Sequence, residues 1–457
     1  MREMVGLLEE AIGAGKVLAS PIDRVAYSFD GTFEQNLPEA VVLPETTEEV
    51  AAVVRLAAER GVPIVTRGMA SGLAGGAIPT PGSIVLSLIR MNRILEIDRE
   101  NMTATVEAGV ITSDLEAAVA KVGLFYPPDP SSNKQSTIGG NIACNAGGPR
   151  CLKYGVTGDY VMGLTVVLAD GRVLETGGKA IKNVVGYDLT SLFVGSEGTL
   201  GIITTALLRL VAQPRFARTA LAEFASLDDA ARTVNAILAA GIVPATLEMM
   251  DETAIACIEE AMHLGLPLDV EAMLIIETDG SDEEAVVREI EAAAAICAEN
   301  GARQVKVARD EAERASLWRA RRSVSPSLAR KAPNKLGEDI TVPRSAIPQA
   351  VRRVKEISAR YGLPIVVFGH AGDGNLHPNI LFDRRDAEQW AKVEQMVGEI
   401  FQVALDLGGT LSGEHGVGTF KQPYMLQALG PVSVDVQWAI KRALDPKNIL
   451  NPGKVLP

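Results

Sequence analysis

Cysteine is scarce in this chain, with 4 residues in 457 and no Cys-x-x-Cys spacing. A disulfide framework is therefore excluded, and nothing suggests a zinc knuckle or an iron–sulfur cluster built from this chain alone. Long apolar runs are also absent, since none reaches the roughly 18 residues that a membrane-spanning helix needs. The N-terminus does not resemble a signal peptide, because acidic residues interrupt its apolar stretch. We expect a cytoplasmic protein, in contact with the inner membrane only through a partner.

Positive charge is in deficit, with 44 Lys and Arg against 57 Asp and Glu and a net charge of −13 at pH 7. Proteins that bind nucleic acid carry basic surfaces, so we expect no nucleic-acid partner. Hydrophobic residues make up 47 % and charged residues 22 %, which is the balance of a globular protein. The length allows two or three domains and a large buried core.

The first strand–helix–strand pattern begins with the short apolar strand Ala40–Leu43. Thr46 and Glu49 then have the spacing of a helix capping box, and the apolar residues of 50–60 recur with helical periodicity. A second strand is predicted over Val62–Thr66, after a glycine that ends the helix.

Similar units are expected further along the chain, over 220–246, 272–308 and 340–366, after a β-rich stretch over 83–210. Near residues 211–216 the composition changes from Gly-rich motifs to Ala-rich amphipathic helices. We therefore predict an α+β protein with two domains, 1–213 and 214–457, the first of which begins with an N-terminal helix.

Glycine is abundant, with 43 residues, and three clusters stand out. The first, Thr66–Gly76, follows a strand and carries four glycines in nine positions. Backbone N–H groups of such a loop can converge on an anion, and the missing Cβ atoms let a phosphate approach closely. The loop has neither the G-x-G-x-x-G pattern of a Rossmann fold nor the Gly-Lys-Ser/Thr ending of a P-loop. Taken alone, it is equally compatible with a tight turn.

The second cluster combines Pro127–Ser132 with Ser136–Gly148, where small residues and paired glycines alternate with Asn and Ser. It has no positive charge at its centre, and its composition suits a large polar cofactor held by backbone amides. A purely structural stretch of this length rarely needs so many small residues. The third cluster, Phe193–Ile203, leads into a strand.

The order of these clusters resembles the FAD-binding domain of the vanillyl-alcohol-oxidase/PCMH flavoprotein superfamily. The resemblance implies that the first loop wraps the FAD pyrophosphate and that the other two follow the isoalloxazine and adenine ends. Some members attach the flavin covalently through a His or Cys in these loops. Because the first loop here has neither and the second has no His, the resemblance implies non-covalent FAD, with Cys144 and Cys151 as small core or loop residues.

By position, the resemblance assigns a set of loop residues to FAD binding. They are Arg67, Gly68, Ser71, Gly72, Leu73, Gly75, Gly76, Pro128, Asp129, Ser132, Thr137, Gly139, Gly140, Asn141, Asn145, Gly147, Gly148, Gly155, Glu197, Gly198, Gly201, Ile202, Ile203 and Asn451.

Histidine numbers only 4, and three of the four lie in Gly-rich segments. The fourth, His263, lies in a helix-like stretch and is expected to be an ordinary helix residue. The apolar strand 364–368 runs into Gly369–Asn379, where Asp-Gly-Asn predicts a turn before a second apolar run. Across such a turn, His370 and His377 can face each other.

Downstream, Gly408–Gly418 supplies Glu414 and His415 in another Gly-rich turn. Two imidazoles and a carboxylate form an open three-ligand set of the kind that binds a catalytic divalent metal. The competing interpretation is that the histidines merely hydrogen-bond to the backbone at turns. Imidazole and carboxylate suit Zn²⁺, Fe²⁺ and Mn²⁺ alike, so the pattern does not select the metal.

The segments G-H-x-G-D-G-N-L-H and S-x-E-H-G-V-G closely resemble the C-terminal domain of FAD-linked 2-hydroxy-acid dehydrogenases. This group includes the glycolate oxidase flavin subunit, D-lactate dehydrogenases and D-2-hydroxyglutarate dehydrogenase, and the match spans about residues 38–457. The resemblance implies a PCMH-type FAD-binding domain and a C-terminal ferredoxin-like α+β substrate (cap) domain. It also implies that the last segment of the chain returns to the flavin.

Carried over by position, His370, His377 and Glu414 match the metal ligands of the group. His415 matches the proposed catalytic base, and Asn379 matches a polar residue beside the substrate.

One helix is expected to supply a cation for the substrate carboxylate. In the segment L-W-R-A-R-R, Trp318 and Arg321 share a helix face. The group presents an Arg three residues after such a Trp to the substrate carboxylate, and the bidentate geometry of Arg suits that task. We assign Arg321 to substrate binding and catalysis, whereas Arg319 and Arg322 can be surface charges. Lys335 is a further candidate for neutralising the substrate, although the spacing around it departs from that of better-known members.

These residues predict FAD-dependent oxidation of a small D-2-hydroxy acid, glycolate or D-lactate, to the 2-oxo acid, with hydride transfer to flavin N5. D-2-hydroxyglutarate is the alternative substrate. Metal coordination would lower the pKa of the substrate hydroxyl, so that His415 removes its proton near neutral pH. The chain carries no second redox motif, so we expect an external acceptor: an iron–sulfur subunit, an electron-transfer flavoprotein or a quinone. A homo- or hetero-oligomer is compatible with this.

The rival functions belong to other classes. A metal-dependent hydrolase would use the His and Glu residues but leaves the three N-terminal loops unexplained. A non-redox flavoenzyme of the same superfamily, such as alkyl-dihydroxyacetone-phosphate synthase, is not expected to carry the complete histidine set. A binding-only subunit would have lost some of these residues, and none is missing.

Overall fold

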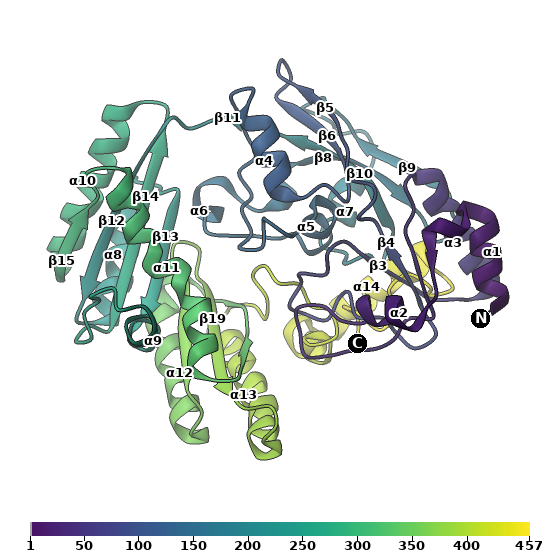
Figure 1. Cartoon of the computed structure of the whole chain (residues 1–457). Coiled ribbons are helices and arrows are strands. Elements are labelled where there is room, and N and C mark those ends of the chain that lie inside the picture. Colours follow the sequence, from purple (N-terminus) through teal and green to yellow (C-terminus); the bar gives the residue numbers. More distant parts are fainter. Residues whose placement is uncertain (1) are drawn as a thin grey trace. The chain divides into compact units, whose positions relative to one another are not determined.

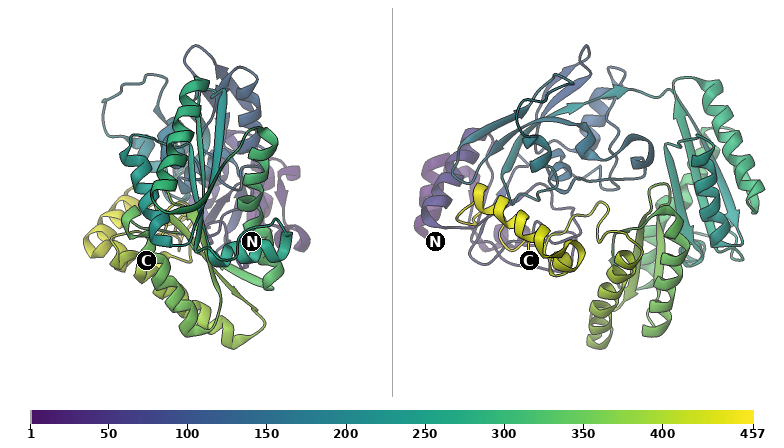
Figure 2. Two further views of the ribbon diagram at one scale, coloured as in Figure 1. Left: turned by 90° about the vertical axis from the view of Figure 1, so that its left-hand side faces the viewer. Right: turned by 180° about the vertical axis from the view of Figure 1, so that it is seen from behind.

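The computed structural model describes residues 2–457, which divide into two compact units (Figures 1 and 2). Unit 1 comprises the described residues up to Gly148, together with Val156–Gln213 and Glu414–Pro457. Unit 2 comprises Pro149–Gly155 and Pro214–Gly413. The chain therefore passes from unit 1 into unit 2 twice, at residues 149 and 214, and it returns each time, so that its last residues belong to unit 1. No helix among residues 2–457 is long and apolar enough to span a membrane.

The first sheet of unit 1 has four strands in the order β1-β2-β4-β3. These strands are β1 (Val17–Leu18), β2 (Ala40–Val42), β4 (Ile84–Ser87) and β3 (Ile64–Arg67). The predicted helix α3 (Thr47–Arg60) connects β2 to β3, and both of these strands pair in parallel with β4. Helix α1 (Arg2–Ile12) packs on α3. At its ends, the Thr46 side chain accepts the Glu49 N–H, and Gly61 takes the left-handed conformation at φ 63°. The closing glycine and the Thr46 cap are as predicted, whereas the Glu49 carboxylate accepts the N–H of Glu45 at 2.8 Å in place of the Thr46 N–H that a capping box requires.

The second sheet of unit 1 is antiparallel, with five strands in the order β5-β6-β10-β8-β9. These strands are β5 (Ile94–Asp98), β6 (Thr103–Glu107), β10 (Ile202–Arg209), β8 (Val161–Val167) and β9 (Val173–Gly177). Its core includes apolar residues of α4 (Thr112–Ala120) and of α5 (Ile138–Cys144). The kinked C-terminal helix α14 (Met425–Leu444) adds Leu444 to this core. The β-rich stretch of the sequence therefore folds as expected, with short helices between its strands.

Unit 2 is built on an eight-stranded sheet in the order β15-β12-β14-β13-β18-β19-β16, with β17 also paired to β19. Its strands are β12 (Phe216–Phe224), β13 (Thr246–Asp251), β14 (Ala272–Gly280), β15 (Ala302–Val307), β16 (Asn334–Gly337), β17 (Ile340–Thr341), β18 (Ile365–His370) and β19 (Asn375–Phe382). All these pairings are antiparallel.

Helices cover both faces of the unit 2 sheet (Figure 2). One face carries α9 (Glu252–Met262) and α11 (Glu311–Lys331), whose buried apolar residues share a core with Met250, Ile275 and Phe368. The remaining helices are α8 (Leu227–Ala239), α10 (Glu283–Glu299), α12 (Ile347–Tyr361) and α13 (Ala387–Asp406). His263 lies just past α9 as its left-handed C-terminal cap, at φ 50°, and not within a helix as expected from the sequence.

Candidate functional site

The β18–β19 hairpin of unit 2 brings two histidines together. His370 ends β18 and His377 lies on β19, and the turn between the strands spans residues 371–374. The two Nε2 atoms lie 3.3 Å apart, and the side chains are only 3 % and 7 % exposed. The structure confirms that the hairpin places these rings face to edge, with ring centroids 5.1 Å apart.

A buried carboxylate on the neighbouring strand holds His370 from its other side. Glu248 of β13 is the register partner of His370, and its Oε1 lies 2.5 Å from Nδ1 of that ring. Glu248 is 0 % exposed. Burial alone would raise the pKa of this carboxyl, but its interactions with His370 and Arg321 outweigh burial and hold the pKa below its ordinary value.

Arg321 of α11 is the second partner of Glu248. Its Nε donates to Glu248 Oε2 at 2.7 Å, and its guanidinium carbon lies 4.7 Å from the centre of the Phe368 ring. The predicted substrate-binding arginine is therefore held in one plane by a carboxylate and an aromatic face. Sequence reasoning missed Glu248, although a charged residue inside the apolar strand Thr246–Asp251 is a recognisable signal for a buried, partnered group.

Asn379 and Lys335 lie on the strands beside the hairpin. The Asn379 amide donates to the carbonyl of His377 at 2.8 Å, and Gly337 of β16 lies opposite it in the ladder. A Cβ on Gly337 would stand 2.7 Å from Asn379 Oδ1, so only glycine leaves room for this side chain. The Lys335 ammonium donates to the Ser325 hydroxyl on α11, and burial lowers the pKa of this lysine.

Glu414 and His415 follow the point where the chain passes from unit 2 to unit 1. On the unit 2 side, the buried Asp339 accepts the Ser412 hydroxyl at 2.8 Å and the Gly413 N–H at 3.0 Å. Asp339 thus fixes the chain immediately before Glu414. This aspartate was also missed in the sequence, where it lies outside any Gly-rich motif.

On the unit 1 side, Glu197 fixes the chain immediately after His415. Its carboxylate accepts the N–H groups of Val417 at 2.6 Å and Gly418 at 2.9 Å. Burial raises the pKa of Glu197, and these two hydrogen bonds act in the opposite direction. The carboxylate of this predicted FAD residue therefore anchors the histidine-bearing segment.

The three Gly-rich clusters pack against one another in unit 1. Gly68 lies so close to Thr137 that a Cβ would collide with its hydroxyl, and Glu197 donates its N–H to Ala143 at 2.8 Å. The Asn451 amide reaches the carbonyls of Gly76 at 3.1 Å and Glu197 at 2.7 Å. The structure therefore brings the three loops and the C-terminal segment together, as the resemblance implies.

For two of the residues assigned to FAD, the structure gives another environment than the resemblance implies. Arg67 donates from Nη1 to the carbonyls of Tyr27 at 3.1 Å and Phe29 at 3.0 Å, and burial lowers its pKa. Gly155 lies in the short segment Pro149–Gly155 that belongs to unit 2. The role of both residues toward FAD stays a prediction.

The remaining assigned residues lie in unit 1. Cys144 of the second loop is partly buried, and desolvation raises the pKa of its thiol, which makes it a poor nucleophile. The others in the three loops and at the start of β10 are Ser71, Gly72, Leu73, Gly75, Pro128, Asp129, Ser132, Gly139, Gly140, Asn141, Asn145, Gly147, Gly148, Gly198, Gly201, Ile202 and Ile203.

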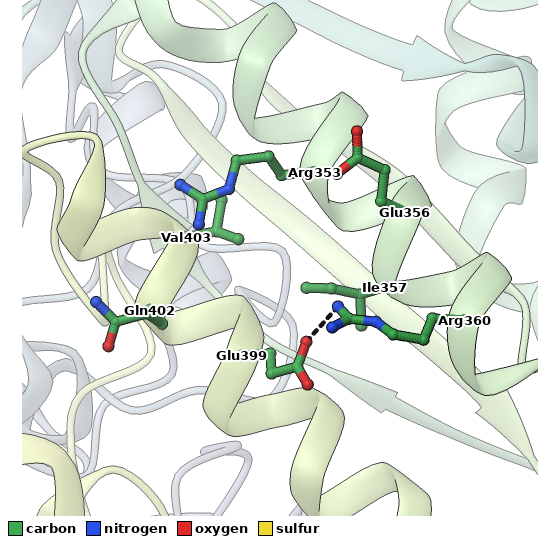
Figure 3. A pocket seen from close by; sticks show the side chains of 7 residues that line it. All are labelled: Arg353, Glu356, Ile357, Arg360, Glu399, Gln402 and Val403. Atoms are coloured by element: carbon green, nitrogen blue, oxygen red, sulfur yellow. Dashed lines mark hydrogen bonds and ion pairs between the residues drawn. The ribbon is translucent and has the colours of Figure 1, made fainter.

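A separate hollow of unit 2 lies between α12 and α13 (Figure 3). It is lined by Arg353, Glu356, Ile357, Arg360, Glu399, Gln402 and Val403. Two of its charged side chains pair with each other, since Arg360 Nη2 lies 2.5 Å from Glu399 Oε2, and Arg353 pairs with Asp406 outside the lining. None of the predicted site residues lines it, so we do not assign the activity to this hollow.

Two family models match the chain: "FAD linked oxidases, C-terminal domain" over residues 213–455 and "FAD binding domain" over residues 38–177. The chain belongs to the FAD-linked oxidases. It is an FAD-dependent oxidoreductase, and the family and enzyme class expected from its motifs are confirmed.

Relatives of this FAD-linked oxidase match over nearly its whole length. The glycolate oxidase subunit GlcD of Bacillus subtilis is 51 % identical over 433 residues, which are 94 % of this chain and 92 % of the relative. A D-lactate dehydrogenase of Archaeoglobus fulgidus is 39 % identical over 438 residues, or 94 % and 95 % of the two chains.

Among solved structures, p-cresol methylhydroxylase with bound substrate superposes with a TM-score of 0.84 at 20 % identity, covering 99 % of this chain and 96 % of that one. The chain therefore has the same fold as p-cresol methylhydroxylase. Together with the two family models, this confirms the predicted fold class of an FAD-binding domain joined to a C-terminal α+β domain.

Proposed function

We propose that this FAD-linked oxidase converts a small D-2-hydroxy acid, glycolate or D-lactate, to the 2-oxo acid. The names of the two relatives above support this substrate class, and the observation in the structure that supports it most is the Arg321–Glu248–His370 arrangement. It combines a cation for a carboxylate with a histidine oriented for a metal, within one buried face of unit 2.

Unit 1 has the features expected of a non-covalent FAD site. Its three Gly-rich loops lie against one another, and a Cβ on Gly72 would meet no atom within 4 Å, which leaves room for a ligand along the first loop. We propose that residues 1–213 hold FAD and that residues 214–457 form the substrate domain, with the last segment, which contains Asn451 and folds in unit 1, returning to the flavin. FAD held by these loops would supply the hydride acceptor for oxidation of the substrate α-carbon.

His370 and His377 fit a divalent metal, Zn²⁺, Fe²⁺ or Mn²⁺. Histidines that bind metals almost always donate their other ring nitrogen to a carboxylate or carbonyl, and His370 Nδ1 faces Glu248 in this way. We propose Glu414, which directly follows the anchored Gly413, as the third ligand. A metal held there would lower the pKa of the substrate hydroxyl.

The other residues of the chain bind the substrate and move its proton. The two Nη groups of Arg321 are available for a bidentate contact with the substrate carboxylate, because its Nε is used by Glu248. A ring nitrogen of His415 takes the hydroxyl proton, and the anchoring of its segment by Glu197 and Asp339 keeps that imidazole in position. Asn379 and Lys335 provide further polar contacts for the substrate.

The electrons then leave to a partner. The relative from Bacillus subtilis is named as a subunit, which supports an assembly in which another chain accepts electrons. We propose an iron–sulfur subunit, an electron-transfer flavoprotein or a quinone as the acceptor.

The test is anaerobic reduction of the bound flavin by glycolate, D-lactate, L-lactate and D-2-hydroxyglutarate in turn. We expect bleaching of the flavin absorbance by glycolate or D-lactate and none by L-lactate. Bleaching by D-2-hydroxyglutarate alone would move the substrate to the alternative acid. A flavin that none of the four reduces would contradict the proposal, and so would a protein that does not bind FAD.

A further inference from the structure

Glu248 is a buried carboxylate whose two oxygens each have a different partner. Oε1 lies 2.5 Å from His370 Nδ1, and Oε2 accepts Arg321 Nε at 2.7 Å. Burying a carboxylate in a strand is costly unless both oxygens are paired. Its neighbours Leu247 and Met249 are buried apolar residues. The other buried carboxylate of the strand, Asp251 at its end, pairs with Lys355 and not with a histidine.

We infer that Glu248 is a positioning residue, which selects the tautomer of His370 and the orientation of Arg321 through one side chain. An ionised carboxylate only accepts hydrogen bonds, so His370 donates from Nδ1, and the neutral form of the ring then offers Nε2 as its acceptor atom. That Nε2 is the atom that faces His377 at 3.3 Å. The tautomer needs neither ligand nor activity, whereas its consequence for catalysis rests on the proposed function.

The same carboxylate also limits the guanidinium. With Nε bound to Glu248 and the plane held over the Phe368 ring, Arg321 can direct its two Nη groups only along that plane. Phe368 also contacts His377, with ring centroids 5.6 Å apart. A shift of Glu248 would therefore disturb the metal-binding side and the substrate-binding side together.

Replacing this carboxylate by an amide separates the two functions. The amide of Glu248→Gln has one acceptor oxygen, but Arg321 Nε–H and His370 Nδ1–H both need an acceptor. Because the hydrogen bond from a charged guanidinium is the stronger one, the amide oxygen is expected to turn to Arg321. The amide NH₂ group then faces His370 Nδ1, which must accept, so the proton moves to Nε2 and blocks that atom as a ligand.

The chain offers a matched control on the next strand. Glu277 of β14 is also buried and also pairs with an arginine of α11, since Arg314 Nη1 lies 2.8 Å from its Oε2. The same Oε2 atom also accepts hydrogen bonds from Trp318 Nε1 at 2.8 Å and from the Thr219 hydroxyl at 2.7 Å. Glu277→Gln therefore removes a similar buried charge without removing a hydrogen bond to a histidine.

The decisive measurement is the side-chain ¹⁵N spectrum of the FAD-loaded, metal-free chain labelled at histidine, which has only 4 such residues to assign. We expect His370 to be the Nδ1–H tautomer in the wild type and in Glu277→Gln, and the Nε2–H tautomer in Glu248→Gln. An Nε2–H tautomer in the wild type, or an unchanged tautomer in Glu248→Gln, would overturn the inference.

Titration with Zn²⁺ alone provides the second readout. We expect about 10–100-fold weaker Zn²⁺ binding for Glu248→Gln and no change for Glu277→Gln. Arg321→Lys keeps Glu248 in place, so it should retain the tautomer and the Zn²⁺ affinity while raising the KM for the 2-hydroxy acid. A changed tautomer in Arg321→Lys would contradict the assignment of that tautomer to Glu248 alone, and this variant also tests the inference if Glu248→Gln does not fold.

The two hypotheses fail in different ways. If the tautomer changes as expected but no 2-hydroxy acid reduces the flavin, the proposed function is wrong and the positioning role of Glu248 stands. If the flavin is reduced normally but the tautomer does not depend on Glu248, the positioning role of Glu248 is wrong and the proposed function stands.

Discussion

Glu197 in unit 1 and Glu248 in unit 2 are both buried glutamates, but they bind different kinds of donor. Glu197 accepts two backbone N–H groups, and Glu248 accepts side-chain nitrogens of a histidine and an arginine. A backbone donor cannot change its protonation, so Glu197 fixes only the path of a chain segment. An imidazole can carry its proton on either nitrogen, so Glu248 also decides what that ring offers to a ligand.

The pKa directions of these two carboxyls agree with this difference. Burial raises the pKa of Glu197 despite its two backbone hydrogen bonds. Burial would also raise the pKa of Glu248, but a guanidinium and an imidazole overcome it and lower the pKa. One glutamate therefore serves the shape of the site and the other serves its chemistry.

The largest expected effect concerns the segment that Glu197 holds. His415→Ala should slow flavin reduction by the 2-hydroxy acid by about 10²–10⁴-fold, because the general base is lost. The FAD absorbance spectrum should not change. His263→Ala, which alters the exposed cap of α9, is the control and should react at the wild-type rate. Near-normal reduction in His415→Ala would mean that Glu197 anchors a segment without a chemical role.

Glu197→Gln tests whether that carboxylate is purely structural. One of the two N–H groups loses its acceptor, so the free energy of unfolding should fall by about 1–3 kcal/mol in urea denaturation. The tautomer of His370 should not change, in contrast to Glu248→Gln. Glu59→Gln, at an exposed position of α3, should stay within about 0.5 kcal/mol of the wild type. An altered His370 spectrum in Glu197→Gln would remove the distinction between the two glutamates.

The packing of the FAD loops in unit 1 can be separated from their contact with FAD by two glycines. A Cβ on Gly139 would stand 2.7 Å from the Ala108 Cβ and 3.0 Å from its carbonyl oxygen. Gly139→Ala should therefore lower the free energy of unfolding of the FAD-free protein by about 1–3 kcal/mol. Gly72→Ala should leave that free energy unchanged and weaken FAD binding, measured by flavin fluorescence. Equal stability losses in both variants would contradict this assignment.

The smallest expected effect is the pH dependence of Lys454, whose ammonium donates to the carbonyls of Gly75 at 2.6 Å and Ile78 at 2.8 Å. Burial lowers the pKa of this lysine to about 8. The unfolded chain keeps the proton until roughly pH 10.4, so between these values the unfolded state binds more protons and stability rises with pH.

The free energy of unfolding of the wild type relative to Lys454→Met should therefore increase by at most about 1.4 kcal/mol per pH unit between pH 8 and 10. Below pH 7, this difference in the free energy of unfolding should not depend on pH. A difference that falls with rising pH would contradict the lowered pKa of Lys454.

Much of this site could be predicted from residues near one another in the sequence. The facing of His370 and His377 follows from seven-residue spacing across a turn, and the loop clusters were recognisable from their glycines. Glu248 could not be assigned a partner, because His370 and Arg321 lie 122 and 73 residues away and meet it only when β13 pairs with β18 and α11 packs on the sheet.

Two further features also depend on tertiary contacts. The resemblance assigns Arg67 to FAD binding, but its guanidinium donates to carbonyls of the chain some 40 residues earlier, at Tyr27 and Phe29. The segment Pro149–Gly155 belongs to unit 2 because Lys153 and Tyr154 bind the Asp279 carboxylate, each through one short contact. Neither its length nor its composition indicates this.

The most direct test of the central claim is single-turnover flavin reduction by D-lactate or glycolate, measured without oxygen before metal removal, after chelation and after Zn²⁺, Fe²⁺ or Mn²⁺ is restored. We expect rapid reduction, then loss of reduction with FAD still bound, then recovery with one of the three ions. Equal rates before and after complete metal removal would contradict the role assigned to His370 and His377, and with it the proposed mechanism.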